Sequence, residues 1–101
     1  MKQEKYTIFF DTGAALLPGT LNLCQTDRGL SGDIMLMGHG TTIDKGEIQG
    51  NERRFSGSIW YKEQEVPFQA EGVVNDGLLD IDIAIWDQVF ALTGFPAEEK
   101  A

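Results

Sequence analysis

The sequence predicts an all-β fold, an antiparallel meander of about eight short strands. Three observations lead to this prediction. Apolar residues alternate with period two along most of the 101-residue chain, turn residues recur every ~8–12 residues, and no window of a dozen residues has a helical period. An eight-stranded meander exposes two edges unless it closes. We therefore expect a small up-and-down barrel or a strongly curved sheet, with a two-sheet β-sandwich as the alternative.

The first half of the chain contains four predicted strands. In each strand the apolar residues occupy every second position, although glycines interrupt the fourth. The best helical candidate is residues 14–17, which Pro18-Gly19 limits to one turn. The apolar positions of the four strands are Tyr6, Ile8 and Phe10; Leu21 and Leu23; Leu30, Gly32, Ile34 and Leu36; and Ile43 and Ile48.

Four more strands follow in the second half. The clearest hairpin turn is Asn75-Asp76-Gly77, because these residue types tolerate the positive φ that tight hairpin turns need. Further turns are predicted at residues 26–29, 50–52 and 62–65. The apolar positions of these strands are Phe55, Gly57, Ile59 and Tyr61; Val66, Phe68, Ala70 and Gly72; Leu79, Ile81, Ile83 and Ile85; and residues 89–93.

Two stretches of the chain resemble each other. Residues 28–36 read RGLSGDIML and residues 53–61 read RRFSGSIWY, so both have the form R-x-[LF]-S-G-x-I-x-[LY]. We interpret this similarity as a repeated hairpin strand, with a duplicated ligand motif as the alternative. Gly32 and Gly57 lie inside their strands, where glycine often marks a bend or a close approach of two backbones. The repeat therefore favours a curved sheet.

The meander resembles the layout of calycin-like barrels, and this resemblance is architectural. The predicted strands are too short for a full-size lipocalin. The early Gly-x-Trp of that family is also absent, since Trp60 and Trp86 both lie in the second half of the chain. The resemblance implies a barrel and carries no functional residue across. Eight strands enclose an interior just wide enough for side chains or for one small ligand.

Composition and charge narrow the class of partner. Sixteen acidic against eight basic residues give a formal net charge of −8, which argues against nucleic acid and anionic membranes as partners. Cys24 is the single cysteine, so no intramolecular disulfide forms. No signal peptide or apolar run of ~20 residues is visible. We expect a cytoplasmic protein with one β domain over residues 1–101, whose residues 1–4 and 97–101 are flexible tails.

Two sets of polar residues are candidates for chemistry. His39 is the only histidine, and it could act as a general base if Asp33 or Asp44 oriented it. Asp80 and Asp82 lie about 7 Å apart on one face of a strand, where they could bind a hard cation. The favoured interpretation is structural for both sets: an exposed turn histidine and two solvated aspartates. We expect no cofactor.

Four residues are candidates for binding a ligand or a partner. Met35, Met37, Trp60 and Arg54 project from faces opposite the main apolar rows of their strands. A second face that is partly apolar has to be covered. A second copy of the chain is the favoured cover because two-fold homodimers are the commonest assembly. Another protein, a small apolar ligand or the loop formed by residues 13–20 are the alternatives.

The sequence contains no motif that identifies an activity. The favoured prediction is a small, non-enzymatic binding or interaction module that forms a homodimer. The alternative is a β-barrel that binds a small ligand, or an enzyme that uses His39 with nearby carboxylates. An apolar cavity inside the barrel would favour the alternative.

Overall fold

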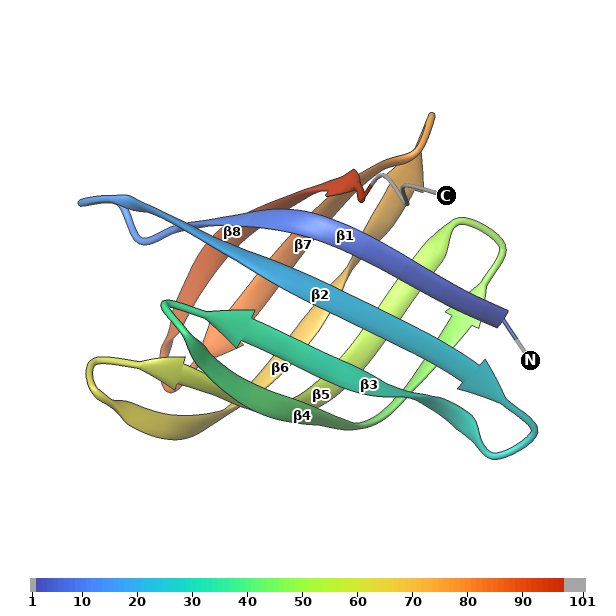
Figure 1. Ribbon diagram of the computed structural model, residues 1–101, viewed down its shortest axis with the longest axis horizontal. Coiled ribbons are helices and arrows are strands. Elements are labelled where there is room, and N and C mark those ends of the chain that lie inside the picture. The colour runs from blue at the N-terminus through green and yellow to red at the C-terminus, as the bar shows by residue number, and fades with distance from the viewer. Residues whose placement is uncertain (1, 98–101) are drawn as a thin grey trace.

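The computed structural model describes residues 2–97 as eight antiparallel strands in a closed barrel, without helices (Figure 1). Each strand pairs with its neighbours in the chain, and β1 pairs with β8 to close the barrel. This confirms the predicted all-β meander and its closure as an up-and-down barrel. The strands are β1 (Lys2–Asp11), β2 (Leu16–Thr26), β3 (Gly29–Leu36), β4 (His39–Gln49), β5 (Glu52–Tyr61), β6 (Gln64–Asn75), β7 (Leu78–Ile85) and β8 (Gln88–Pro96).

The barrel interior is occupied by apolar side chains from all eight strands. They come from alternate positions, as the period-two pattern predicts, and many are completely inaccessible to solvent. Nearly all of the predicted apolar positions belong to this core. At one end of the barrel, the rings of Phe10, Tyr61 and Phe90 pack against one another with centroids 5.4 to 6.3 Å apart. The interior is therefore a packed core.

A buried polar cluster lies at the other end of the barrel. The Tyr6 hydroxyl donates a hydrogen bond to Glu4 Oε1 (2.9 Å), and the Arg53 Nε–H and Nη2–H groups donate to the Glu4 carboxylate at 3.1 and 2.9 Å. Arg53 Nη1 also donates to the carbonyl oxygens of Gly50 and Glu52. Burial, together with the hydrogen bond to Glu4, raises the pKa of Tyr6 to about 12.

The four hairpin turns that the sequence predicts are present, between β2 and β3, β4 and β5, β5 and β6, and β6 and β7. Asp76 and Gly77 have φ values of 52° and 82°, which confirms the positive φ expected in this turn. Lys62 and Glu63 also adopt positive φ, at 51° and 63°. The connections β1–β2, β3–β4, β5–β6 and β7–β8 gather at one end of the barrel, at the left of Figure 1.

The repeated Ser-Gly stretches form β3 and β5. A Cβ atom at Gly32 would overlap the carbonyl oxygen of Asn22, and one at Gly57 would overlap that of Thr42. Each glycine thus lets its strand approach the backbone of the preceding strand closely. The close approach predicted for these glycines is confirmed.

Three local expectations are wrong. Residues 14–17 form no helical turn, because Leu16 and Leu17 already belong to β2, where they pair with Asp11 and Phe10 of β1. For the same reason, residues 16–20 are strand, and only residues 12–15 form the connection between β1 and β2, which is too short to cover the sheet. Residues 2–4 are not a tail, since they pair with β2 as the start of β1. Residues 98–101 of the predicted C-terminal tail lie outside the described residues.

Within residues 2–97 there is no helix of the length and apolarity needed to cross a membrane.

Candidate functional site

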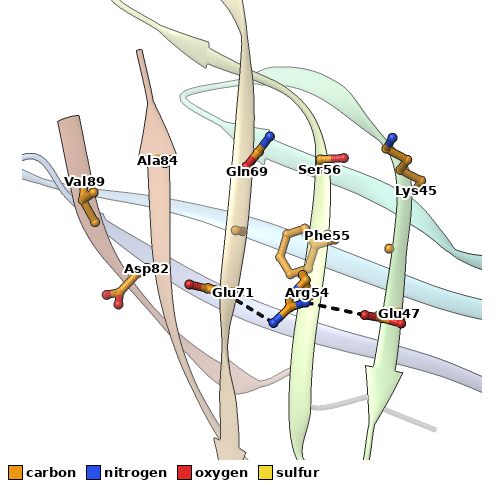
Figure 2. Close-up of a pocket in the computed structure, with 12 residues that line it drawn as sticks. Lys45, Glu47, Arg54, Phe55, Ser56, Gln69, Glu71, Asp82, Ala84 and Val89 are labelled. Carbon is orange, nitrogen blue, oxygen red and sulfur yellow. Dashed lines mark ion pairs between the residues drawn. The ribbon is translucent and has the colours of Figure 1, made fainter. Parts of the chain in front are cut away.

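The outer surface of the barrel carries a groove of about 750 Å³ that extends across β4, β5, β6, β7 and the start of β8 (Figure 2). Outward side chains of these strands line it, and Phe55 and Ala70 lie beneath them. Two cross-strand rows of residues account for most of the lining. The charged row is Glu47, Arg54, Glu71 and Asp82. The second row runs from Lys45 through Ser56, Gln69 and Ala84 to Val89, and we call it the neutral row because Lys45, at its β4 end, is its one charged member.

A β-bulge in β4 turns the first member of each row outward. The register of β4 against β5 shifts between Ile43 and Lys45, which leaves Asp44 as an extra residue. Ile43 is buried in the core, and without the shift Lys45 and Glu47 would follow it into the barrel. The bulge therefore moves two charged side chains from the core face to the groove.

The charged row has more carboxylates than cations. Arg54 lies between Glu47 and Glu71, with N–O distances of 3.8 and 3.6 Å, and 68 % of its side chain is exposed. These distances are too long for hydrogen bonds, so the two ion pairs stabilise the fold only weakly. Glu71 and Asp82 are directly opposite each other in the β6–β7 ladder, where two like charges repel. A cationic group bound here would relieve that repulsion.

A second outer surface, the β3–β5 patch, consists of Met35, Met37, His39 and Trp60. The imidazole ring of His39 stacks on the indole of Trp60, with centroids 3.8 Å apart and planes inclined by 12°. Met35 lies opposite Gly40 in the β3–β4 ladder, and Met37 is at the tip of the turn with φ of 52°. Met35 and Met37 are 47 % and 63 % exposed.

Asp33 and Asp44, the two carboxylates considered as partners of His39, accept hydrogen bonds from other residues. Asp33 accepts a hydrogen bond from Asn22 (2.8 Å), and Asp44 accepts one from the hydroxyl group of Thr42 (3.3 Å). In the described part of the chain, no hydrogen bond or ion pair joins either carboxylate to His39. The contact that the structure gives this imidazole is the ring of Trp60.

Asp80 and Asp82 are exposed on the outer face of β7, where they alternate with the inward and fully buried Leu79, Ile81 and Ile83. Asp82 belongs to the groove, whereas Asp80 lies opposite Val73 and Thr93 in the neighbouring row. Among residues 2–97, no group of three or more histidine, cysteine, aspartate or glutamate side chains could hold a metal ion.

The predicted partner-binding residues therefore divide between two surfaces. Met35, Met37 and Trp60 belong to the β3–β5 patch, together with the catalytic candidate His39, while Arg54 lies in the groove. The groove as a unit was not predicted from the sequence. A signal was available, because a two-residue hairpin turn fixes the pairing of its strands, and successive turns then place Glu47, Arg54, Glu71 and Asp82 in one row.

No protein-family model, curated protein or solved structure matches this chain.

Proposed function

We propose that this protein is a small, cytoplasmic, non-enzymatic binding module that forms a homodimer through the β3–β5 patch. The observation that carries the proposal is the exposure of large apolar side chains on the outer surface of a barrel whose interior is already filled. Recognition then depends on outward side chains. The barrel closes within one chain, so a second copy is not needed to pair a strand edge.

The composition of the patch supports self-association. Met35 and Met37 are flexible apolar side chains that adapt to a facing surface, and Trp60 contributes a large ring that is only partly buried. Burying these three side chains against a second copy would contribute several kcal/mol at ~25 cal/mol per Å² of apolar area. A two-fold axis through the patch would bury it in both chains.

An enzyme or a barrel for small apolar ligands has less support. Apolar side chains of the protein itself fill the interior where such a ligand would bind. His39 stacks on an indole ring, and within residues 2–97 no carboxylate forms a hydrogen bond or ion pair with it. An activity that is lost in His39→Ala while the fold is retained would favour the enzyme.

Analytical ultracentrifugation tests the dimer. We expect the protein to sediment as a dimer and Trp60→Ser to shift it toward monomer, because the change removes the largest ring of the patch. Phe95→Ser is the matched control: Phe95 is 41 % exposed on β8, on the other side of the barrel. A wild-type protein that remains monomeric at roughly 100 µM would contradict the proposal. Its dissociation constant would then be above roughly 100 µM, which corresponds to a binding free energy weaker than about −5.5 kcal/mol.

Fluorescence gives an independent measurement. In a Trp86→Phe background, the remaining emission comes from Trp60. We expect this emission to move to longer wavelength on dilution, as the indole ring loses its cover and meets water. An emission maximum that is independent of concentration would show that a second copy does not cover Trp60.

A further inference from the structure

We propose that the groove over β4–β8 is a docking site for an extended segment of another protein, in which a lysine or arginine lies close to an apolar residue. This inference rests on the proposed binding role but not on the proposed dimer. The groove and the β3–β5 patch are separate surfaces. Ser56 of the groove and Trp60 of the patch both point outward on β5, four residues or about 13 Å apart.

Charge complementarity identifies the cationic part of the segment. Glu71 and Asp82 face each other across β6 and β7, and the ion pairs of Arg54 with Glu71 and with Glu47 are long. In the adjacent row, Glu52 and Asp80 add two exposed carboxylates on the side away from the neutral row. An incoming ammonium or guanidinium group would lie between Glu71 and Asp82 and offset their repulsion.

The neutral row identifies the apolar part. Ala84 and Val89 are opposite each other in the β7–β8 hairpin and form the apolar end of the groove. Val89 is 68 % exposed, so most of its side chain is accessible to a bound segment. The Ala84–Val89 pair lies two residues along the strands from Asp82, a distance of about 7 Å. In an extended segment, a cationic and an apolar side chain two residues apart lie on the same face and have this separation.

The size of the groove suits a short segment. Crossing from β4 to β8 covers four strand spacings, or about 19 Å, which corresponds to roughly six extended residues. A volume of about 750 Å³ accommodates several side chains and lies within the usual range for binding pockets. Because each strand of the barrel already has two paired neighbours, the segment would be held by its side chains and not by strand addition.

Three labelled eight-residue peptides test the inference by fluorescence anisotropy. The first repeats Lys-Lys-Leu-Leu, so that each face of the extended peptide presents a lysine followed by a leucine. The second repeats Lys-Lys-Ser-Ser, and the third repeats Glu-Glu-Leu-Leu. We expect the first peptide to bind most tightly. Its affinity should fall with added salt, since the contacts are between exposed charges. Equal binding of the first and second peptides would overturn the inference, because it would mean attraction to net charge alone.

Variants locate the site. We expect the double variant Glu71→Gln/Asp82→Asn to weaken binding of the Lys-Lys-Leu-Leu peptide roughly fivefold or more, and Val89→Ser to weaken it too. The double variant Asp33→Asn/Glu63→Gln removes the same number of charges from β3 and the β5–β6 turn and should leave the affinity within about twofold. An equal loss in both double variants, or no loss in the groove variant, would overturn the inference.

The proposed dimer and the groove can fail separately. Groove variants should sediment like the wild type, because the β3–β5 patch is unchanged in them. If the wild type is monomeric but the groove variants lose peptide affinity as expected, the dimer fails and the docking site stands. If the dimer is found and none of the three peptides binds, the docking site fails and the dimer stands.

Discussion

Arg53 and Glu4 close the end of the barrel at which β1 begins. Arg53 is only 5 % exposed, and a buried guanidinium without partners would be costly. Glu4 neutralises it, and the carbonyl oxygens of Gly50 and Glu52 accept further hydrogen bonds from it. Within residues 2–97 no buried side-chain nitrogen or oxygen lacks a hydrogen-bond partner. The cluster therefore anchors β1 to β5 across the interior.

The pKa of Tyr6 makes this cluster sensitive to alkaline pH. Its folded-state pKa of about 12 lies above the ordinary value of 10.0, so the hydroxyl group stabilises the fold fully below pH 10 and loses this contribution as pH rises toward 12. We expect Tyr6→Phe to cost about 1 kcal/mol of unfolding free energy at pH 7. The difference between the two proteins should shrink between pH 10 and pH 12.

Urea denaturation of both proteins at pH 7, 10 and 11 provides the measurement. The comparison with Tyr6→Phe serves as the control, because other groups that titrate in this range are common to both proteins. A difference that stays constant up to pH 11 would show that the Tyr6 hydroxyl group is not stabilised in its protonated form.

At the scale of elements, β4 shows how one inserted residue redirects a strand. The apolar residues Ile43 and Ile48 are five positions apart, an odd number that period-two alternation does not allow on one face. The bulge between Ile43 and Lys45 resolves the conflict, because Ile43 and Ile48 then both face the core while Lys45 and Glu47 point into the groove. The odd spacing was visible in the sequence as a weak, glycine-broken strand.

The close approach at Gly57 is testable with a single methyl group. A Cβ at this position would overlap the Thr42 carbonyl oxygen and would lie 2.8 Å from Ile43 Cα. We expect Gly57→Ala to destabilise the barrel by roughly 1–3 kcal/mol, because backbone atoms must shift to admit the methyl group. The expected result is a lower melting temperature in a calorimetric scan.

Gly40→Ala is the matched control in the neighbouring strand. The nearest atom to a Cβ there is the flexible Cε of Met35 at 3.8 Å, which is an ordinary contact distance. We expect its melting temperature to equal or slightly exceed that of the wild type, since alanine reduces the freedom of the unfolded chain. Similar destabilisation by both changes would mean that the overlap at Gly57 is not the cause.

The strands and the core could be predicted from sequence because alternation is a local signal. The alternation in β7 predicts that Ile81, Ile83 and Ile85 face the core, whichever strands pair with β7. In the same way, the residue types of Asp76-Gly77 predict a turn at that point. The start of β2 at Leu16 could not be predicted in this way. Its extension comes from pairing with β1, which overrides the local helical preference of residues 14–17.

The candidate site was less predictable because it depends on several strands at once. Arg54 and Asp82 were each recognised as outward residues, but their common groove appears only when three hairpin registers and the bulge in β4 are combined. The stacking of His39 on Trp60 likewise joins two side chains that are 21 positions apart in the sequence. Neither arrangement has a local signature.

At the scale of the whole molecule, the pairing of β1 with β8 closes the barrel. These strands pair from Tyr6↔Pro96 to Asp11↔Ala91, so the barrel is complete only when both ends of the chain are in place. Contacts between such distant segments form late and slowly in folding. The stability of the barrel should therefore depend strongly on its last strand.

Removal of β8 tests this dependence. A chain that ends at Asp87 lacks Leu92 from the core and exposes the edges of β1 and β7. We expect it to lose the cooperative thermal transition in circular dichroism and to aggregate. Phe95→Ser, which keeps β8 in place, should retain the transition. A truncated chain that melts cooperatively would show that the first seven strands are sufficient.

The closed barrel has a consequence for the history and reuse of this fold. Alternate residues of each strand face the core and the solvent. The inward positions therefore specify the scaffold, and the outward positions between them specify the surface. Substitutions at outward positions such as Gln69, Ala84 or Val89 can accumulate without changing the core residues that specify the scaffold. Descendants of such a protein could exchange one partner for another while their barrels remain superimposable, and a designer could randomise the same positions to obtain new binders from one stable frame.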